Sequence, residues 1–148
     1  MRPARLLALL ALAAAAGPAS AQRVEVVGGS VEIVVPFDGV AFGTGVDASA
    51  GLRWEGRQGD RFKITVVSAV RGQSYDLRVT AVNTRFGKAT GPVALEAGML
   101  PHDVVTNINA GNWRNRTGEA TLRYEASAPT EAGSGADHHS VVYTLTQQ

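Results

Sequence analysis

Apolar and polar residues alternate one by one along several stretches of this chain. In 60–68, Phe62, Ile64 and Val66 alternate with charged or hydroxyl-bearing neighbours, and 74–83 and 119–127 repeat the pattern. Successive side chains of a β-strand point to opposite faces of the sheet, so a period of two predicts strands with one buried and one solvated face. No stretch of ten or more residues after residue 21 shows the 3.6 period of an amphipathic helix. The pattern therefore predicts an all-β chain.

Short apolar stretches recur about every ten residues, which favours an antiparallel, immunoglobulin-like β-sandwich of about eight strands over a closed barrel. The predicted strands are 23–27, 31–35, 52–55, 60–68, 74–83, 92–97, 103–108, 119–127 and 138–146. The glycine pair at 28–29 indicates either a tight hairpin turn or a bulge in one longer strand. The glycine-rich stretch 37–51 fits a loop or a weak strand equally well.

The first 21 residues have the pattern of a signal peptide. Arg2 and Arg5 form a basic start, 6–16 is an apolar run, and Ala19-Ser20-Ala21 is a small-x-small cleavage site. The run is shorter than the roughly 20 apolar residues that a membrane-spanning helix needs. We therefore predict cleavage before Gln22, a single domain over 22–148 without a stable membrane span, and export to the periplasm, cell surface or medium.

Composition excludes several functional classes. The chain has no cysteine, so a disulfide, a thiol nucleophile and a cysteine-based zinc site are all excluded. Removal of residues 1–21 leaves 12 Lys and Arg residues against 13 Asp and Glu residues, a net charge of −1 with His neutral. Nucleic-acid binding usually requires a clustered basic excess, and the sequence does not have one.

The histidines are the residues best suited to metal binding or acid–base chemistry. His138 and His139 are adjacent, so on a strand they face opposite sides of the sheet and do not easily share one metal ion. His102 lies in an earlier turn, and the interpretation of all three as solvated polar residues is favoured over metal binding. No serine stands in a Gly-x-Ser-x-Gly turn. We expect no catalytic residues, no metal and no cofactor.

Two features indicate interaction surfaces. Trp54 and Trp113 are the candidate ligand contacts, because exposed aromatic rings can stack on sugars. The alternative is that Trp54 belongs to the core and Trp113 folds back over one end of the sandwich. The segment 24–35 is apolar and carries only Glu25 and Glu32, so it is a candidate for strand exchange or addition between subunits. The alternative is an ordinary first strand.

The C-terminal pattern predicts two strands joined as a long hairpin by the loop 128–137. It reads Leu122-Arg123-Tyr124-Glu125-Ala126-Ser127-Ala128, then Ala132-Gly133, then Val141-Val142-Tyr143-Thr144-Leu145-Thr146. This pattern resembles a hairpin of exported bacterial β-sandwich proteins, namely spore-coat-U-like and fimbrial (pilin-like) domains, and surface proteins of the WxL type are similar. The chain lacks the usual pilin disulfide and has Gln147 where a tyrosine is usual.

What this resemblance implies is a structural role at a surface or in an appendage. We therefore expect a secreted or cell-surface structural or adhesive subunit without catalysis, which self-associates or binds another envelope protein through a strand edge. The alternative is a carbohydrate-binding sandwich that uses Trp113 and the loops beside it.

Overall fold

A computed structural model describes residues 23–70, 73–129 and 137–148. The predicted signal peptide lies outside the described residues, as does most of the predicted loop 128–137. The described residues form strands and their connections, without a helix. In this part of the chain, no helix is long and apolar enough to cross a membrane.

The described residues form nine β-strands, close to the eight or so that the pattern predicts. In chain order they are β1 (Val24–Val27), β2 (Thr44–Arg57), β3 (Arg61–Val70), β4 (Asp76–Arg85), β5 (Lys88–Ala89), β6 (Val93–Ala94), β7 (His102–Asn109), β8 (Asn115–Ser127) and β9 (His139–Gln147). The bounds of β3, β4, β7 and β9 lie within two residues of those predicted. The prediction misses the two-residue β5, and it begins β8 four residues late because the polar residues of 115–118 resemble a loop.

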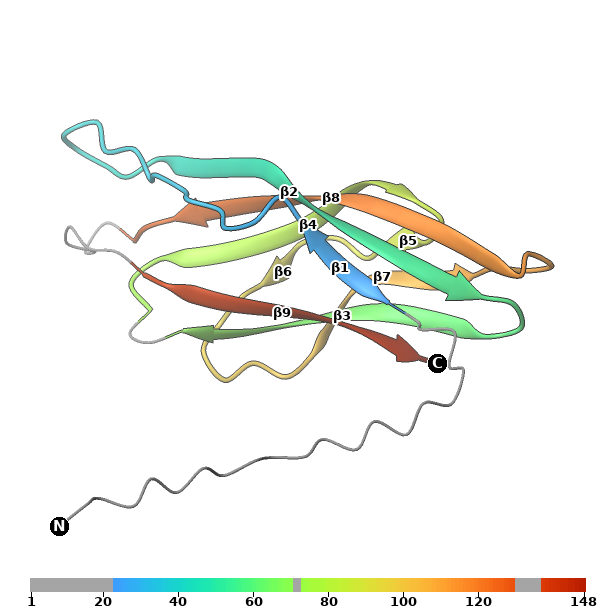
Figure 1. Cartoon of the computed structure of the whole chain (residues 1–148). Coiled ribbons are helices and arrows are strands. Elements are labelled where there is room, and N and C mark those ends of the chain that lie inside the picture. Colours follow the sequence, from blue (N-terminus) through green and yellow to red (C-terminus); the bar gives the residue numbers. More distant parts are fainter. Residues whose placement is uncertain (1–22, 71–72, 130–136) are drawn as a thin grey trace, which may run out of the picture.

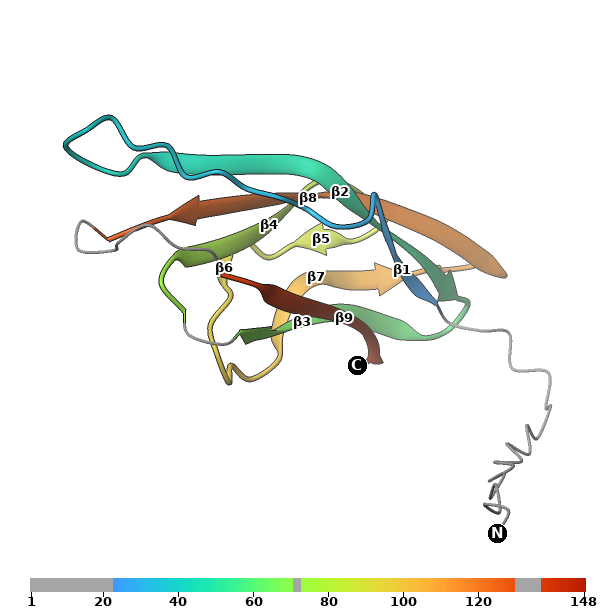
Figure 2. The ribbon, with the colours of Figure 1, turned by 60° about the vertical axis from the view of Figure 1, so that its left-hand side comes forward.

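The strands form two antiparallel sheets that pack face to face as a β-sandwich (Figures 1 and 2). The five-stranded sheet has the order β1-β2-β8-β4-β6, and the four-stranded sheet has the order β5-β7-β3-β9. From β2 to β9 the chain changes sheet at every step, so among the described strands only β1 and β2 are both consecutive and paired. Immunoglobulin domains keep several consecutive strands in one sheet. The architecture is therefore the predicted sandwich with a different strand order.

The predicted C-terminal hairpin does not form, which corrects the pairing expected for the last two strands. β8 lies inside the five-stranded sheet and is paired with β2 on one side and with β4 on the other. β9 pairs with β3 in the four-stranded sheet. A strand has two edges, and both edges of β8 are occupied over residues 119–127, so β9 cannot pair there. Alternation identifies a strand and its buried face, but it does not identify the partner.

β2 starts at Thr44, inside the glycine-rich stretch 37–51, whose sequence fits a loop or a weak strand equally well. Its register with β8 shifts between Asp47 and Ala50, which marks a β-bulge. The Asp47 Oδ1 atom accepts hydrogen bonds from the Ser49 backbone N–H at 2.8 Å and from the Ser49 hydroxyl at 2.7 Å. The bulge interrupts the period of two, and this local hydrogen bonding lets the strand continue through it.

The chain does not turn back after β1. Gly28 and Gly29 have φ angles of 106° and 76°. The chain then runs on beside the first half of β2, where Gly28 lies against Ser49 and Gly45 lies against Val34. Gly45 of β2 packs so closely against the backbone of Val34 that it leaves no room for a side chain. Of the two alternatives for the glycine pair, the hairpin turn is wrong, because the chain continues in the same direction past it. The predicted strand 31–35 is also wrong, since these residues belong to none of the described strands and do not extend β1 into one longer strand.

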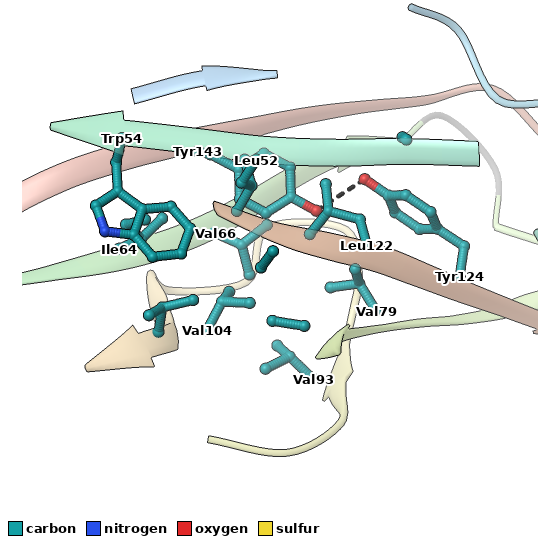
Figure 3. Close-up of a cluster of buried hydrophobic side chains, with 14 of the residues drawn as sticks. Leu52, Trp54, Ile64, Val66, Val79, Val93, Val104, Leu122, Tyr124 and Tyr143 are labelled. Carbon is teal, nitrogen blue, oxygen red and sulfur yellow. Dashed lines mark hydrogen bonds between the residues drawn. The ribbon is translucent and has the colours of Figure 1, made fainter. Parts of the chain in front are cut away.

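The core fills the space between the sheets. The inward positions predicted from the alternation in β3, β4 and β8 are buried, except that Tyr75 and Leu77 are half-buried. Its largest fully buried side chains include Leu52, Trp54, Phe62, Ile64, Leu95, Ile108 and Leu122. Tyr124 of β8 and Tyr143 of β9 come from opposite sheets, and their hydroxyl oxygens are 2.8 Å apart (Figure 3). This buried hydrogen bond links the two sheets where the sequence predicted a hairpin.

Candidate functional site

Trp54 is a core residue. Its side chain is 1% exposed, and its indole Nε1–H donates a hydrogen bond to the Phe86 carbonyl oxygen at 3.1 Å. The Phe86 backbone has a φ of 61°, and its ring lies 4.7 Å from the Arg116 guanidinium. Gly118 packs directly against the indole. A ligand in solvent cannot reach Trp54, which corrects its prediction as a ligand contact and agrees with the alternative of a core residue.

Trp113 is exposed, at 67%, in the connection between β7 and β8. Its backbone N–H donates to the Ala110 carbonyl at 3.0 Å, so residues 110–113 form a turn. Because Trp54 is buried, the two tryptophans do not form a shared stacking platform. Trp113 is therefore an isolated aromatic side chain in this loop, with polar neighbours.

The three histidines have different surroundings. His102 and His138 are exposed, while His139 is half-buried with its Nδ1 atom 3.3 Å from the Ser68 hydroxyl oxygen. Burial lowers the pKa of His139, and the negative charge of Asp137 partly opposes this. Among the described residues, no group of three or more His, Cys, Asp or Glu side chains is arranged to hold a metal ion.

Ser68, His139 and Asp137 lie in one region, which the sequence did not predict because the serine is 71 residues from the histidine. The Asp137 Oδ2 atom accepts hydrogen bonds from the backbone N–H groups of Ser74 at 2.7 Å and Tyr75 at 2.8 Å. Ser68 is only 5% exposed. A hydrolytic triad needs an accessible serine and an acid that orients the histidine. These contacts instead join the start of β9 to β3 and to the chain before β4.

The outer edge of β9 is a candidate interaction surface. Among the described strands β9 pairs only with β3, through nine consecutive residue pairs without a register shift. The Gln148 N–H donates to the Arg61 carbonyl at 2.8 Å, so even-numbered residues direct their backbone groups toward β3. The backbone N–H and C=O groups of the odd-numbered residues therefore face outward. They belong to His139, Val141, Tyr143, Leu145 and Gln147.

The side chains of β9 do not protect this edge. The strand contains no Asp, Glu, Lys, Arg, Gly or Pro, and Val142 on its outer face is 54% exposed. Proteins usually shield long edge strands with charges, prolines or bulges, because an open edge pairs readily with another chain. The sequence signal was the run 139–147 without a charged residue or a turn residue. The predicted hairpin would have covered one edge of this strand.

β9 faces β1 on the same side of the sandwich, without a hydrogen-bonded ladder between the two described strands (Figure 1). A groove of about 370 Å³ lies between the chain around Val26–Ile33 and β9, and Tyr124 and Tyr143 are among its lining residues. A second groove of about 690 Å³ shares part of this lining and extends along residues 31–35 to Leu77 and Ala126. The segment expected to exchange strands thus borders the open edge of β9.

Comparisons of the chain with known protein families, with curated proteins and with solved structures find no match.

Proposed function

We propose that the protein is an exported, non-catalytic structural subunit of a bacterial surface or appendage, and that it assembles by strand addition at the outer edge of β9. The observation that carries the proposal is the nine-residue, unshielded edge of β9. The pattern of residues 1–21 supports export, and the C-terminal sequence resemblance supports a surface role.

The other edge strands are less suited to strand addition. β5 and β6 have two residues each, and β1 has four. The start of β1 also carries a charged pair, because the Arg23 guanidinium lies 3.4 Å from the Glu25 carboxylate. A row of backbone hydrogen bonds with a partner strand needs several consecutive free groups, and β9 provides the longest row among the described strands. We therefore place the contact at β9 rather than at 24–35.

The proposal is tested by the solution mass of the exported protein, measured by light scattering over a concentration series. The double variant Val142→Lys/Thr144→Lys places two positive charges on the outer face of the edge strand, where the copies of a symmetric pair would repel each other. The control Thr117→Lys adds an exposed charge on β8, which lies between β2 and β4 in the five-stranded sheet. We expect the parent protein and the control to reach a larger mass than the double variant at every concentration, because only the double variant has lost the β9 contact. A parent protein that is monomeric at all concentrations would refute the proposal.

A carbohydrate-binding module is the second candidate, and the exposure of Trp113 favours it. Indole rings stack on sugar faces only when they are accessible, as this one is. In that case the fluorescence of Trp113 should shift when glycans are added, and Trp113→Ala should abolish the shift. The absence of a shift across a glycan panel would leave the structural role as the better explanation.

A further inference from the structure

The two ends of the sandwich present different charged side chains. Between Val27 and Arg53 the chain has no lysine or arginine, and its charged residues are Glu32, Asp38 and Asp47. Residues 36–43, here called the tip loop, project beyond the end of β2 and β8 (Figures 1 and 2). The charged residues of the tip loop and of the chain on either side of it are therefore all acidic.

The tip loop is held in one conformation by its own contacts. The Asp38 Oδ1 atom accepts hydrogen bonds from the backbone N–H groups of Val40 at 2.9 Å and Ala41 at 2.8 Å. These bonds lower the pKa of Asp38, so its carboxylate stays charged. The Phe37 and Phe42 rings pack with their centroids 4.9 Å apart, and the Gly43 N–H donates to the Pro36 carbonyl at 2.7 Å. An ordered loop loses little conformational entropy on binding.

The tip loop and its base expose apolar side chains. Val40 is 83% exposed, Val34 75%, Phe37 57% and Val46 50%. Single exposed apolar residues are ordinary on protein surfaces, but a group of them on a projecting, ordered loop indicates a contact surface. We name these four residues the apolar tip.

The opposite end of β2 carries several arginines and the exposed tryptophan. Thr44 pairs with Ser127 at the tip end and Arg57 pairs with Asn115 at the other end, roughly 45 Å away along a strand of this length. The Gln58 N–H donates to the Arg114 carbonyl at 3.3 Å, which joins the β2–β3 turn to the Trp113 loop.

We name this group of four residues the arginine end: Arg57, Trp113, Arg114 and Arg116. Within the described part of the chain, none of its three guanidinium groups is in an ion pair with a carboxylate. The guanidinium of Arg116 lies over the Phe86 ring, whereas those of Arg57 and Arg114 can meet acidic groups of another molecule.

From these two surfaces we infer that the apolar tip of one molecule binds the arginine end of a second copy, head to tail. The indole of Trp113 would cover Val40 and Phe37, while the guanidinium groups would face the Asp38 carboxylate. A contact between two different surfaces of the same chain is heterologous and extends into an open filament unless it closes into a ring. The inference deepens the proposed structural function and rests on it, although the contact uses no residue of β9.

An anionic membrane surface is the other partner that tryptophan and arginine side chains suit. It would account for the arginine end alone and would leave the apolar tip exposed. The charged Asp38 in the middle of the tip also opposes insertion into lipid, because a carboxylate is costly in the hydrocarbon region. A second copy accounts for both surfaces.

The test uses complementary variants in the Val142→Lys/Thr144→Lys background, so that the edge of β9 does not contribute. Val40→Asp disables the tip, and Trp113→Ala/Arg114→Glu disables the arginine end. These positions are exposed, so each variant should unfold at the same urea concentration as the background protein. In a head-to-tail contact each variant alone is monomeric, but a mixture of the two has one intact tip and one intact arginine end.

We expect the mixture to double its mass and to grow no further, while the background protein continues to grow with concentration. In the background protein, acrylamide quenching of Trp113 should fall as the concentration rises.

A mixture that stays at the monomer mass would overturn the inference. So would fluorescence of Trp113 that responds only to anionic lipid vesicles, which would assign the arginine end to membranes. If the parent protein associates and the background does not, the β9 contact stands and the head-to-tail contact fails.

Discussion

The hydrogen bond between Tyr124 and Tyr143 provides a quantitative test of how the two sheets are joined. Tyr143→Phe removes one hydroxyl and leaves the ring in place. The two side chains are 7% and 8% exposed, so the Tyr124 hydroxyl then lacks its partner in a largely dry site. An unsatisfied buried polar group costs about 1–3 kcal/mol. We expect Tyr143→Phe and Tyr124→Phe each to lower the free energy of unfolding by about this amount.

The double variant should behave differently from the sum of the two single variants. When both hydroxyls are removed, no polar group is left without a partner, and the substitution of both partners by similar apolar groups is close to neutral. Because each single variant costs about 1–3 kcal/mol and the double variant close to nothing, the double-mutant cycle should give a coupling free energy of about 2–6 kcal/mol. The assay is urea unfolding of the four proteins at 25 °C, with the m-values compared to confirm the same two-state transition. Two single effects that simply add would refute this hydrogen bond.

The same pair predicts the response to alkaline pH. Burial raises the pKa of both Tyr124 and Tyr143 above the ordinary value near 10. The folded state keeps the two protons where the unfolded chain releases them. The contribution of the pair is therefore fully present below about pH 10 and is lost as the pH rises further, by about 1.4 kcal/mol per pH unit for each tyrosine. The double phenylalanine variant should lose this part of the decline.

Three further predictions concern single positions. Burial lowers the pKa of His139, so its contribution to stability is present above about pH 6.5 and decreases as the pH falls below that value. The variant His139→Gln should therefore lose less urea resistance at pH 5 than the parent protein does. An equal loss in the two proteins would contradict the burial of His139. A Cβ atom at Gly118 would overlap the Trp54 indole, so Gly118→Ala should lower the free energy of unfolding by about 1–3 kcal/mol and change the tryptophan fluorescence. Unchanged stability and emission would show that the indole lies elsewhere. Trp113→Ala removes an exposed side chain and should change the free energy of unfolding by no more than about 0.5 kcal/mol, whereas a larger loss in urea unfolding would indicate that the ring packs on the protein.

The sequence predicts which residues are inside the sandwich because burial follows the period of two. Phe62, Ile64 and Val66 are at most 1% exposed, as their alternation with polar neighbours indicates. The same pattern continues through Leu122 and Tyr124 on β8. The buried faces of these strands could therefore be predicted from local sequence alone.

Strand partners could not be predicted in this way, because they depend on long-range packing. The chain passes from one sheet to the other at every step from β2 to β9, and no local pattern records that choice. A tight hairpin turn would have been a local signal, but 128–137 has the length of a longer connection. The bulge near Asp47 hides β2 for a related reason, since the extra residue shifts the alternation.

The candidate site was only partly predictable. An exposed Trp113 follows from its polar neighbours, and a buried Trp54 is the alternative that the usual behaviour of tryptophan supports. The open edge of β9 follows only from the sheet topology, because a strand is at an edge when no other strand pairs with it. The charge separation between the tip loop and the arginine end also needs the structure, which places the two groups at opposite ends of β2.

The most direct test of assembly through β9 is residue-resolved amide hydrogen exchange at several protein concentrations. The even-numbered residues, such as Val142 and Thr144, donate toward β3 and should be protected at every concentration. The outward-facing N–H groups of Val141, Tyr143 and Leu145 should exchange rapidly in dilute solution and become protected as the concentration rises. Rapid exchange of these three amides at all concentrations, in a sample whose mass nevertheless increases, would show that the subunits associate elsewhere.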